Sequence, residues 1–259
     1  MVSIHLPGGC GSACWRGVRD SGARGPGSRG YGKGMGGSRV RASSATGVRA
    51  VAYIAGVAPL LAEELVVLGR GSAGKSLILP VKLDRGVAGA LLADLAAASR
   101  IGYAGGVVRV TDRTAAGRPV LDMVLQQIAR RDRAPAAWVS KLASQEPVRQ
   151  VKWLPSRIWG PPENAPRPRE ELVARLSDML STQARPDPRT AALAALVAAC
   201  GLSGKLFPGV DGQVRERRLA EISADQWPAE AVRASVRAAV AKLPFKILWA
   251  FKDIGDLLP

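Results

Sequence analysis

The sequence predicts a mainly α-helical protein: a helical bundle ringed by amphipathic helices, with small β-hairpins. Three observations lead to this fold class. Aromatic residues make up only 5% of the chain, and alanine and leucine dominate its middle, a composition typical of packed helices. Apolar residues recur at helical spacing in several segments after residue 58. Short apolar runs around glycine pairs, such as those on either side of Gly105-Gly106, are typical of hairpins.

The expected elements follow one another in a single domain. They are a helix near 59–68, a hairpin near 70–83, a helix over 87–99, a hairpin over 101–112, and helices over 119–131, 135–144, 168–182, 188–200, 212–222 and from 228 onward. Helix 119–131 starts with Pro119, a residue favoured at the first helical position. Its apolar residues share one face: Leu121, Val124, Leu125 and Ile128. Asp187 is expected to cap helix 188–200, which is apolar nearly all round and should therefore be central.

Three regions differ in composition. Residues 1–47 are rich in glycine, serine and arginine and lack hydrophobic periodicity, so we expect a disordered basic tail. Residues 48–243 are expected to form the helical domain. Residues 244–259 are expected to be an amphipathic extension in which Phe245, Leu248, Trp249 and Lys252 share one stripe. Such a stripe either lies in a membrane interface or packs back on the bundle.

The charge of the chain indicates an anionic partner. A formal net charge of +16 over 259 residues favours phospholipid headgroups, nucleic acid or an acidic protein. No apolar run approaches the ~20 residues of a membrane span. Cys10, Cys14, Cys200 and the single histidine, His5, do not have the spacing of a metal site. We therefore expect a reduced cytoplasmic protein that holds no metal and no cofactor.

Residues 69–76 match the P-loop pattern of nucleotide-binding proteins. That site needs a strand, a glycine loop and a helix that follows the loop directly. The apolar run 65–68 suits the strand, but Pro80 comes four residues after Ser76, and proline inside a helix costs about 3 kcal/mol. A glycine-rich hairpin connection with an exposed Lys75 is therefore favoured, and nucleotide binding is kept as an alternative.

We expect no enzymatic activity. Residues 48–259 contain no histidine and no nucleophile elbow. Glu63 and Glu64 are adjacent, so on a helix their side chains point about 100° apart and do not share a site.

The order of several sequence pieces resembles the Golgi phosphoprotein 3 family, including its bacterial members. The pieces are the apolar run 60–68 with its two carboxylates, the glycine–alanine–leucine run 86–96, the segment 117–122, the tryptophan helix 138–142 and the alanine–leucine run 188–196. The resemblance covers roughly residues 58–243 and implies a helical bundle ringed by amphipathic helices. It also implies a peripheral membrane protein, because eukaryotic members bind phosphatidylinositol 4-phosphate and link glycosyltransferase tails to vesicle coats.

The resemblance also identifies candidate lipid-binding residues. The family site uses a tryptophan, an arginine before the alanine–leucine helix, and two arginines three residues apart. The first two positions fall at Leu79 and Ala88 here and are lost, whereas Arg149 and Lys152 match the pair. Lysine keeps the charge but lacks the fork that grips a phosphate, so we expect attraction to anionic lipid without selectivity for one phosphoinositide. The alternative is that both residues belong to a solvated helix face.

The sequence departs from the family after this pair. Family members continue with a longer helix and a hairpin used for self-association. Prolines exclude such a long helix here, at positions 155, 161, 162, 166 and 168. We therefore do not expect the family's self-association contact.

The favoured function is a non-enzymatic, cytoplasmic protein that lies peripherally on an anionic membrane surface. Two alternatives stay open: nucleotide binding through residues 69–76, and nonspecific nucleic-acid binding through the basic tail. The sequence does not identify a protein cargo.

Overall fold

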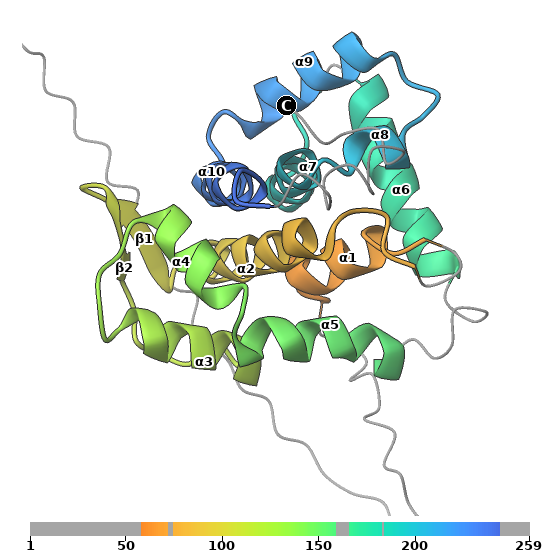
Figure 1. Ribbon diagram of the computed structural model, residues 1–259. Helices are drawn as coiled ribbons and strands as arrows, with labels where there is room; N and C mark the ends of the chain where they lie inside the picture. Colours follow the sequence, from red (N-terminus) through yellow and green to blue (C-terminus); the bar gives the residue numbers. More distant parts are fainter. Residues whose placement is uncertain (1–57, 72–74, 159–165, 183, 244–259) are drawn as a thin grey trace, which may run out of the picture. The chain divides into compact units, whose positions relative to one another are not determined.

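The computed structural model describes residues 58–71, 75–158, 166–182 and 184–243 (Figure 1). Over this part of the chain the elements are α1 (Leu61–Leu68), α2 (Pro80–Ala97), β1 (Ile101–Ala104), β2 (Val107–Val110), α3 (Pro119–Ile128), α4 (Pro135–Leu142), α5 (Glu146–Ile158), α6 (Pro166–Ser181), α7 (Pro188–Cys200), α8 (Ser203–Leu206), α9 (Gly212–Ser223) and α10 (Trp227–Val240). The described part is thus mainly helical with one small hairpin, as the sequence predicts. The basic tail 1–47 and the extension 244–259 lie outside the described residues.

Proline and aspartate explain where many of the helices begin. Proline stands in the first turn of α2, α3, α4, α7 and α10. Its missing N–H is not needed there, and its fixed φ suits the first helical position. The predicted cap of α7 is confirmed: the Asp187 carboxylate accepts hydrogen bonds from the backbone N–H groups of Arg189 and Thr190, both at 3.0 Å. Asp211 caps α9 in the same way.

Helices α2 and α7 lie at the centre of the domain. Helix α2 contacts α1, α4, α5, α7 and α10, and α7 contacts α1, α2, α6, α9 and α10. Two glycines one turn apart allow this close packing. A Cβ at Gly86 would lie 2.4 Å from Cys200 Sγ, and one at Gly89 would lie 2.1 Å from Val232 Cγ2. The prediction that helix 188–200 is central is therefore confirmed.

Helices α3 and α5 cover one side of this centre. Figure 1 shows them along the lower edge, beneath α1 and α2, with α7, α10 and then α9 on the opposite side. Helix α5 contacts α1, α2, α3 and α4, and its inward residues Val148 and Val151 are buried. Its other face, which carries Arg149, Gln150 and Trp153, is exposed to solvent.

The predicted hairpin over 101–112 is confirmed. Strands β1 and β2 pair antiparallel, with Ile101 opposite Val110 and Ala104 opposite Val107. The turn between them consists of Gly105 and Gly106, whose φ angles of +58° and +81° favour glycine.

The predicted hairpin over 70–83 is wrong in its second half. Only an isolated bridge joins Arg70 to Ser76, and α2 begins at Pro80, seven residues before the predicted helix over 87–99. The error lies in treating Pro80 as a helix breaker, because a proline at the first helical position is a start signal.

The prolines after Lys152 differ in their effect on the helices. Helix α5 continues past Pro155 to Ile158, so this proline does not end the helix. Pro166 and Pro168 lie in the first turn of α6, which begins two residues before the predicted helix over 168–182. The short helix α8 was not predicted, because four residues are too few to show a helical period.

Candidate functional site

The two predicted site residues both lie on α5, on different sides of its outer face. The buried side chains of Val148 and Val151 fix the rotation of this helix. Arg149 therefore points into solvent with 68% of its side chain exposed. Lys152, one turn later, lies where α5 borders α2, and only 29% of its side chain is exposed.

Each of these two cations has a carboxylate partner. The Arg149 guanidinium lies 3.1 Å from the carboxylate of Glu146, one turn earlier on the same helix. The Lys152 ammonium forms an ion pair with Asp84 in the first turns of α2. The first pair lies within one exposed helix, whereas the second joins two helices.

Two further arginines are linked to Lys152 through a chain of hydrogen bonds. The Arg70 side chain follows α1 and donates a hydrogen bond from Nη2 to the Lys152 carbonyl at 2.9 Å. The Arg169 side chain on α6 donates from Nε to the Arg70 carbonyl at 3.1 Å. We call Arg70, Arg149, Lys152 and Arg169 the basic cluster.

Trp153 follows Lys152 directly in the chain. The residue is 67% exposed, and it is four residues after Arg149, so both belong to one stripe of α5. A large exposed aromatic next to cations is unusual for a solvated helix face, where aromatic residues are mostly packed. The stripe therefore combines a flat apolar group with positive charge.

Sequence reasoning missed Arg70, Arg169 and Trp153 as parts of this site. Arg70 falls inside the glycine-rich P-loop pattern, and Arg169 falls inside a proline-rich run. Neither segment has a local signal that points to α5. Trp153 had a signal, because it follows Val148 and Val151 at positions that a 3.6-residue period places on the outer face.

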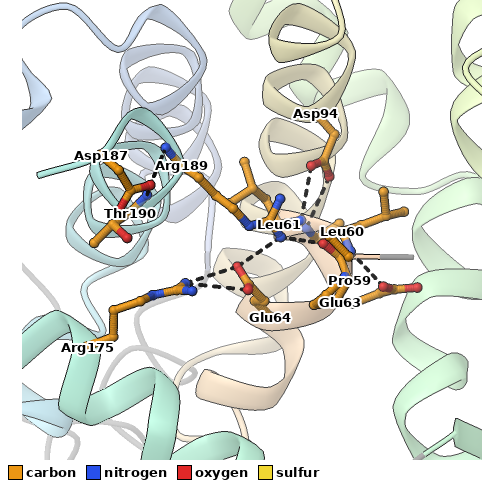
Figure 2. A network of polar contacts seen from close by, with 12 residues as sticks. Pro59, Leu60, Leu61, Glu63, Glu64, Asp94, Arg175, Asp187, Arg189 and Thr190 are labelled. Carbon is orange, nitrogen blue, oxygen red and sulfur yellow. Dashed lines mark hydrogen bonds and ion pairs between the residues drawn. The ribbon is translucent and has the colours of Figure 1, made fainter. Parts of the chain in front are cut away.

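A second group of charged residues is buried at the start of α1 (Figure 2). The carboxylates of Glu63, Glu64 and Asp94 are all buried. Glu63 accepts from the Leu60 N–H at 2.7 Å and pairs with Arg118 at 2.6 Å. Asp94 on α2 accepts from the N–H groups of Leu61 and Ala62 at 3.1 and 3.4 Å. These carboxylates satisfy N–H groups that have no partner within the helix.

Glu64 is held from two other helices. Arg175 of α6 lies 3.4 Å from its carboxylate, and Arg189 of α7 lies 3.2 Å from it. Arg189 also donates to the Pro59 carbonyl. Figure 2 shows these side chains converging on the first turn of α1. Glu63 and Glu64 thus have separate partners and do not form a shared carboxylate pair, in line with their expected orientation.

Burial affects the pKa of two groups in the core. It raises the pKa of Asp94 to about 7, against the opposing effects of the two N–H donors and the Arg189 charge. It raises the pKa of the Cys200 thiol to about 12, which keeps this thiol from reacting as a thiolate at neutral pH. Neither group belongs to the basic cluster.

The P-loop residues do not form the strand–loop–helix arrangement in the described part of the chain. Residues 65–68, which the sequence allowed as a strand, belong to α1, and the next helix begins only at Pro80. The Ser76 hydroxyl, which a P-loop would direct to Mg²⁺, donates to the Ile78 carbonyl at 2.7 Å. Residues 72–74 are not among the residues that the structure describes. The flanking structure therefore differs from that of a nucleotide site.

A family comparison identifies the fold. The sequence pattern that defines the family Golgi phosphoprotein 3 (GPP34) matches residues 61–239. This chain belongs to the Golgi phosphoprotein 3 family. The match runs from the first residue of α1 to residue 239, one residue before the end of α10, so it spans the helices and the hairpin described above. No curated protein matches the chain.

The two positions that the family resemblance marks as lost lie at the start of α2 and in its middle. Leu79 is its N-cap residue and is buried, and Ala88 is fully buried in the core. Neither residue of this Golgi phosphoprotein 3 family member offers a polar group to a ligand. The cations of the basic cluster lie near the start of α2, where Lys152 pairs with Asp84.

Two further features of the described residues concern membranes and metals. No helix in the described residues is both long and apolar enough to cross a membrane. Within the same residues, no three His, Cys, Asp or Glu side chains are grouped as metal ligands would be.

Proposed function

We propose that this Golgi phosphoprotein 3 family member is a peripheral membrane protein that binds anionic phospholipid through the exposed face of α5. The observation that carries the proposal is the stripe formed by Arg149 and Trp153, with Lys152 and Arg70 beside it. Tryptophan favours the boundary between headgroups and acyl chains. Arginine and lysine beside it attract the negative surface of the membrane.

The arrangement favours charge attraction over recognition of one headgroup. The family positions Leu79 and Ala88 are apolar and buried, so they add no ligand to a phosphate. Lys152 presents a single ammonium in place of the bidentate fork of an arginine. We therefore propose that the partner is an anionic lipid surface and that different anionic lipids of similar charge density bind alike.

Vesicle co-sedimentation tests this proposal. The full chain is mixed with vesicles of phosphatidylcholine alone or with added phosphatidylglycerol, at several salt concentrations. Binding should require the anionic lipid and fall as salt rises, because the Debye length shrinks from about 10 Å at 0.1 M to about 3 Å at 1 M. Arg149→Gln and Trp153→Ala should each weaken binding. For Arg149→Gln the expected loss is about fivefold, since a basic residue near an anionic surface contributes about 1 kcal/mol.

A matched control removes one charge elsewhere. Arg217 is exposed on α9, which Figure 1 places on the opposite side of the domain from α5. Arg217→Gln has the same change of net charge as Arg149→Gln and should change binding less than twofold. Equal losses for the two variants would show that net charge alone drives the attraction, and the α5 face would then have no special role.

A further inference from the structure

The two ion pairs of the basic cluster differ in a way that bears on lipid binding. Arg149 and Glu146 are 68% and 56% exposed, and both side chains belong to α5. Lys152 and Asp84 are 29% and 26% exposed and come from different helices. Water screens the first pair strongly, so its arginine exchanges partners easily. The second pair is more shielded from water, so its attraction is stronger.

Asp84 is held in place by the helix that carries it. It lies between Leu83, which is buried in the core, and Arg85, whose guanidinium donates to the Val81 carbonyl at 3.2 Å and to Ser235 Oγ at 3.1 Å. Asp84 therefore stays beside α5 and cannot follow a lysine that turns toward a ligand. An incoming phosphate has to compete with this carboxylate for the three N–H donors of Lys152.

We propose that Asp84 acts as an internal counter-ion that limits the affinity of the basic cluster for lipid phosphate. This inference rests on the proposed function of the α5 face. In the free protein, Asp84 neutralises Lys152, so Arg149 makes the first contact with the anionic surface. A membrane dense in phosphates displaces Asp84 from Lys152 by mass action, whereas an isolated phosphate in solution does not. Asp84 thereby tunes binding to the charge density of the surface.

The test measures how removal of each carboxylate changes binding to phosphatidylcholine vesicles with and without phosphatidylglycerol. Asp84→Asn should raise the affinity for the anionic vesicles about fivefold or more. Glu146→Gln should raise it less than twofold, because its pair is already screened. Glu216→Gln, on the exposed face of α9, has the same change of net charge and should also give less than a twofold increase. Asp84→Ser is measured alongside, in case the amide alters the packing of α2.

A second arm asks whether the gain operates through Lys152. The same substitutions are made in a Lys152→Gln background, which forms a double-mutant cycle. There, Asp84→Asn should increase binding no more than Glu216→Gln does. Inorganic phosphate at millimolar concentration and constant ionic strength should not displace the protein from the vesicles. This should hold both for the unmodified chain and for the Lys152→Gln variant.

The outcomes separate this inference from the proposed function. If the parent binds anionic vesicles but Asp84→Asn and Asp84→Ser gain no more than Glu216→Gln, the counter-ion role is wrong and the lipid function stands. A gain that persists in the Lys152→Gln background also overturns the role of Asp84. If the parent and all variants bind anionic vesicles no better than neutral ones, the proposed function itself is wrong.

Discussion

The guanidinium of Arg189, in the first turn of α7, lies 3.2 Å from the buried carboxylate of Glu64 in the first turn of α1. The same carboxylate pairs with Arg175 of α6, so one glutamate joins α1 to two helices that lie more than 100 residues later in the sequence. Its side chain is only 4% exposed. The contact therefore belongs to the framework of the domain, which also positions the layer that contains α5.

Removing this carboxylate should destabilise the whole domain. Glu64→Gln removes the carboxylate that both arginines contact, and breaking a buried ion pair on one side costs about 3–5 kcal/mol. Because both arginines are roughly one-third exposed, we expect a loss of about 2 kcal/mol in the free energy of unfolding. Urea unfolding measures it. Glu216→Gln on exposed α9 should stay within about 0.5 kcal/mol of the parent. A Glu64→Gln variant as stable as that control would refute the structural role.

Asp94 should make stability depend on pH. Its pKa is raised from 3.8 to about 7 by burial, so the folded protein holds this proton more tightly than the unfolded chain. The resulting stabilisation is complete below about pH 4 and is lost as the pH rises through about 7. In between, it declines by up to about 1.4 kcal/mol per pH unit.

The measurement compares the parent with Asp94→Asn by urea unfolding at pH 5, 6, 7 and 8. Asparagine keeps an acceptor for the start of α1 but does not titrate in this range. The stability of the parent relative to the variant should therefore fall with rising pH. A difference that stays constant from pH 5 to pH 8 would mean that Asp94 remains ionised throughout.

Gly89 should tolerate no side chain beside α10. A Cβ there would lie 2.1 Å from Val232 Cγ2, so Gly89→Ala forces the two helices apart. Overpacking of this kind costs about 1–3 kcal/mol. Adding Val232→Ala removes the clashing methyl groups and should recover part of the stability lost in the single variant. Additive losses in the double variant, again by urea unfolding, would show that the two positions are not in contact.

Lys75→Ala should leave both the fold and vesicle binding unchanged. Lys75 is exposed and lies between α1 and α2, and the residues before the glycine-rich segment form a helix where a P-loop requires a strand. The check combines a melting curve, vesicle co-sedimentation and an ATP-binding titration. Micromolar ATP binding by the parent that Lys75→Ala abolishes would favour the nucleotide alternative.

Much of the fold was predictable because its helices have a clear period and clear start signals. The apolar stripe of α3, the Asp187 cap and the all-round apolar α7 all follow from local sequence. The start of α2 was not predictable, because a proline such as Pro80 is compatible both with the start of a helix and with a break in one. Its use as a start depends on the packing of α2 against α1, α7 and α10, which a local pattern does not contain.

The candidate site was less predictable than the fold. Arg149 and Lys152 were found because they match a family pattern within five residues of one helix. Their surroundings depend on contacts between residues far apart in the chain: Asp84 with Lys152, Arg70 with the Lys152 carbonyl, and Arg169 with the Arg70 carbonyl. No sequence period brings these residues together. The ion pair between Asp84 and Lys152 is therefore seen only in the structure.

The most direct test asks which face of the domain contacts the membrane. A cysteine at Gln150, on the exposed face of α5, is labelled with an environment-sensitive fluorophore after Cys10 and Cys14 are replaced by serine. Cys200 is buried, and its raised pKa keeps it from reacting with the label. A matched label is placed at the exposed Ala220 on α9. The account predicts that vesicles containing phosphatidylglycerol shift the emission at position 150 to the blue and leave position 220 unchanged. A shift at position 220 without one at position 150 would contradict it.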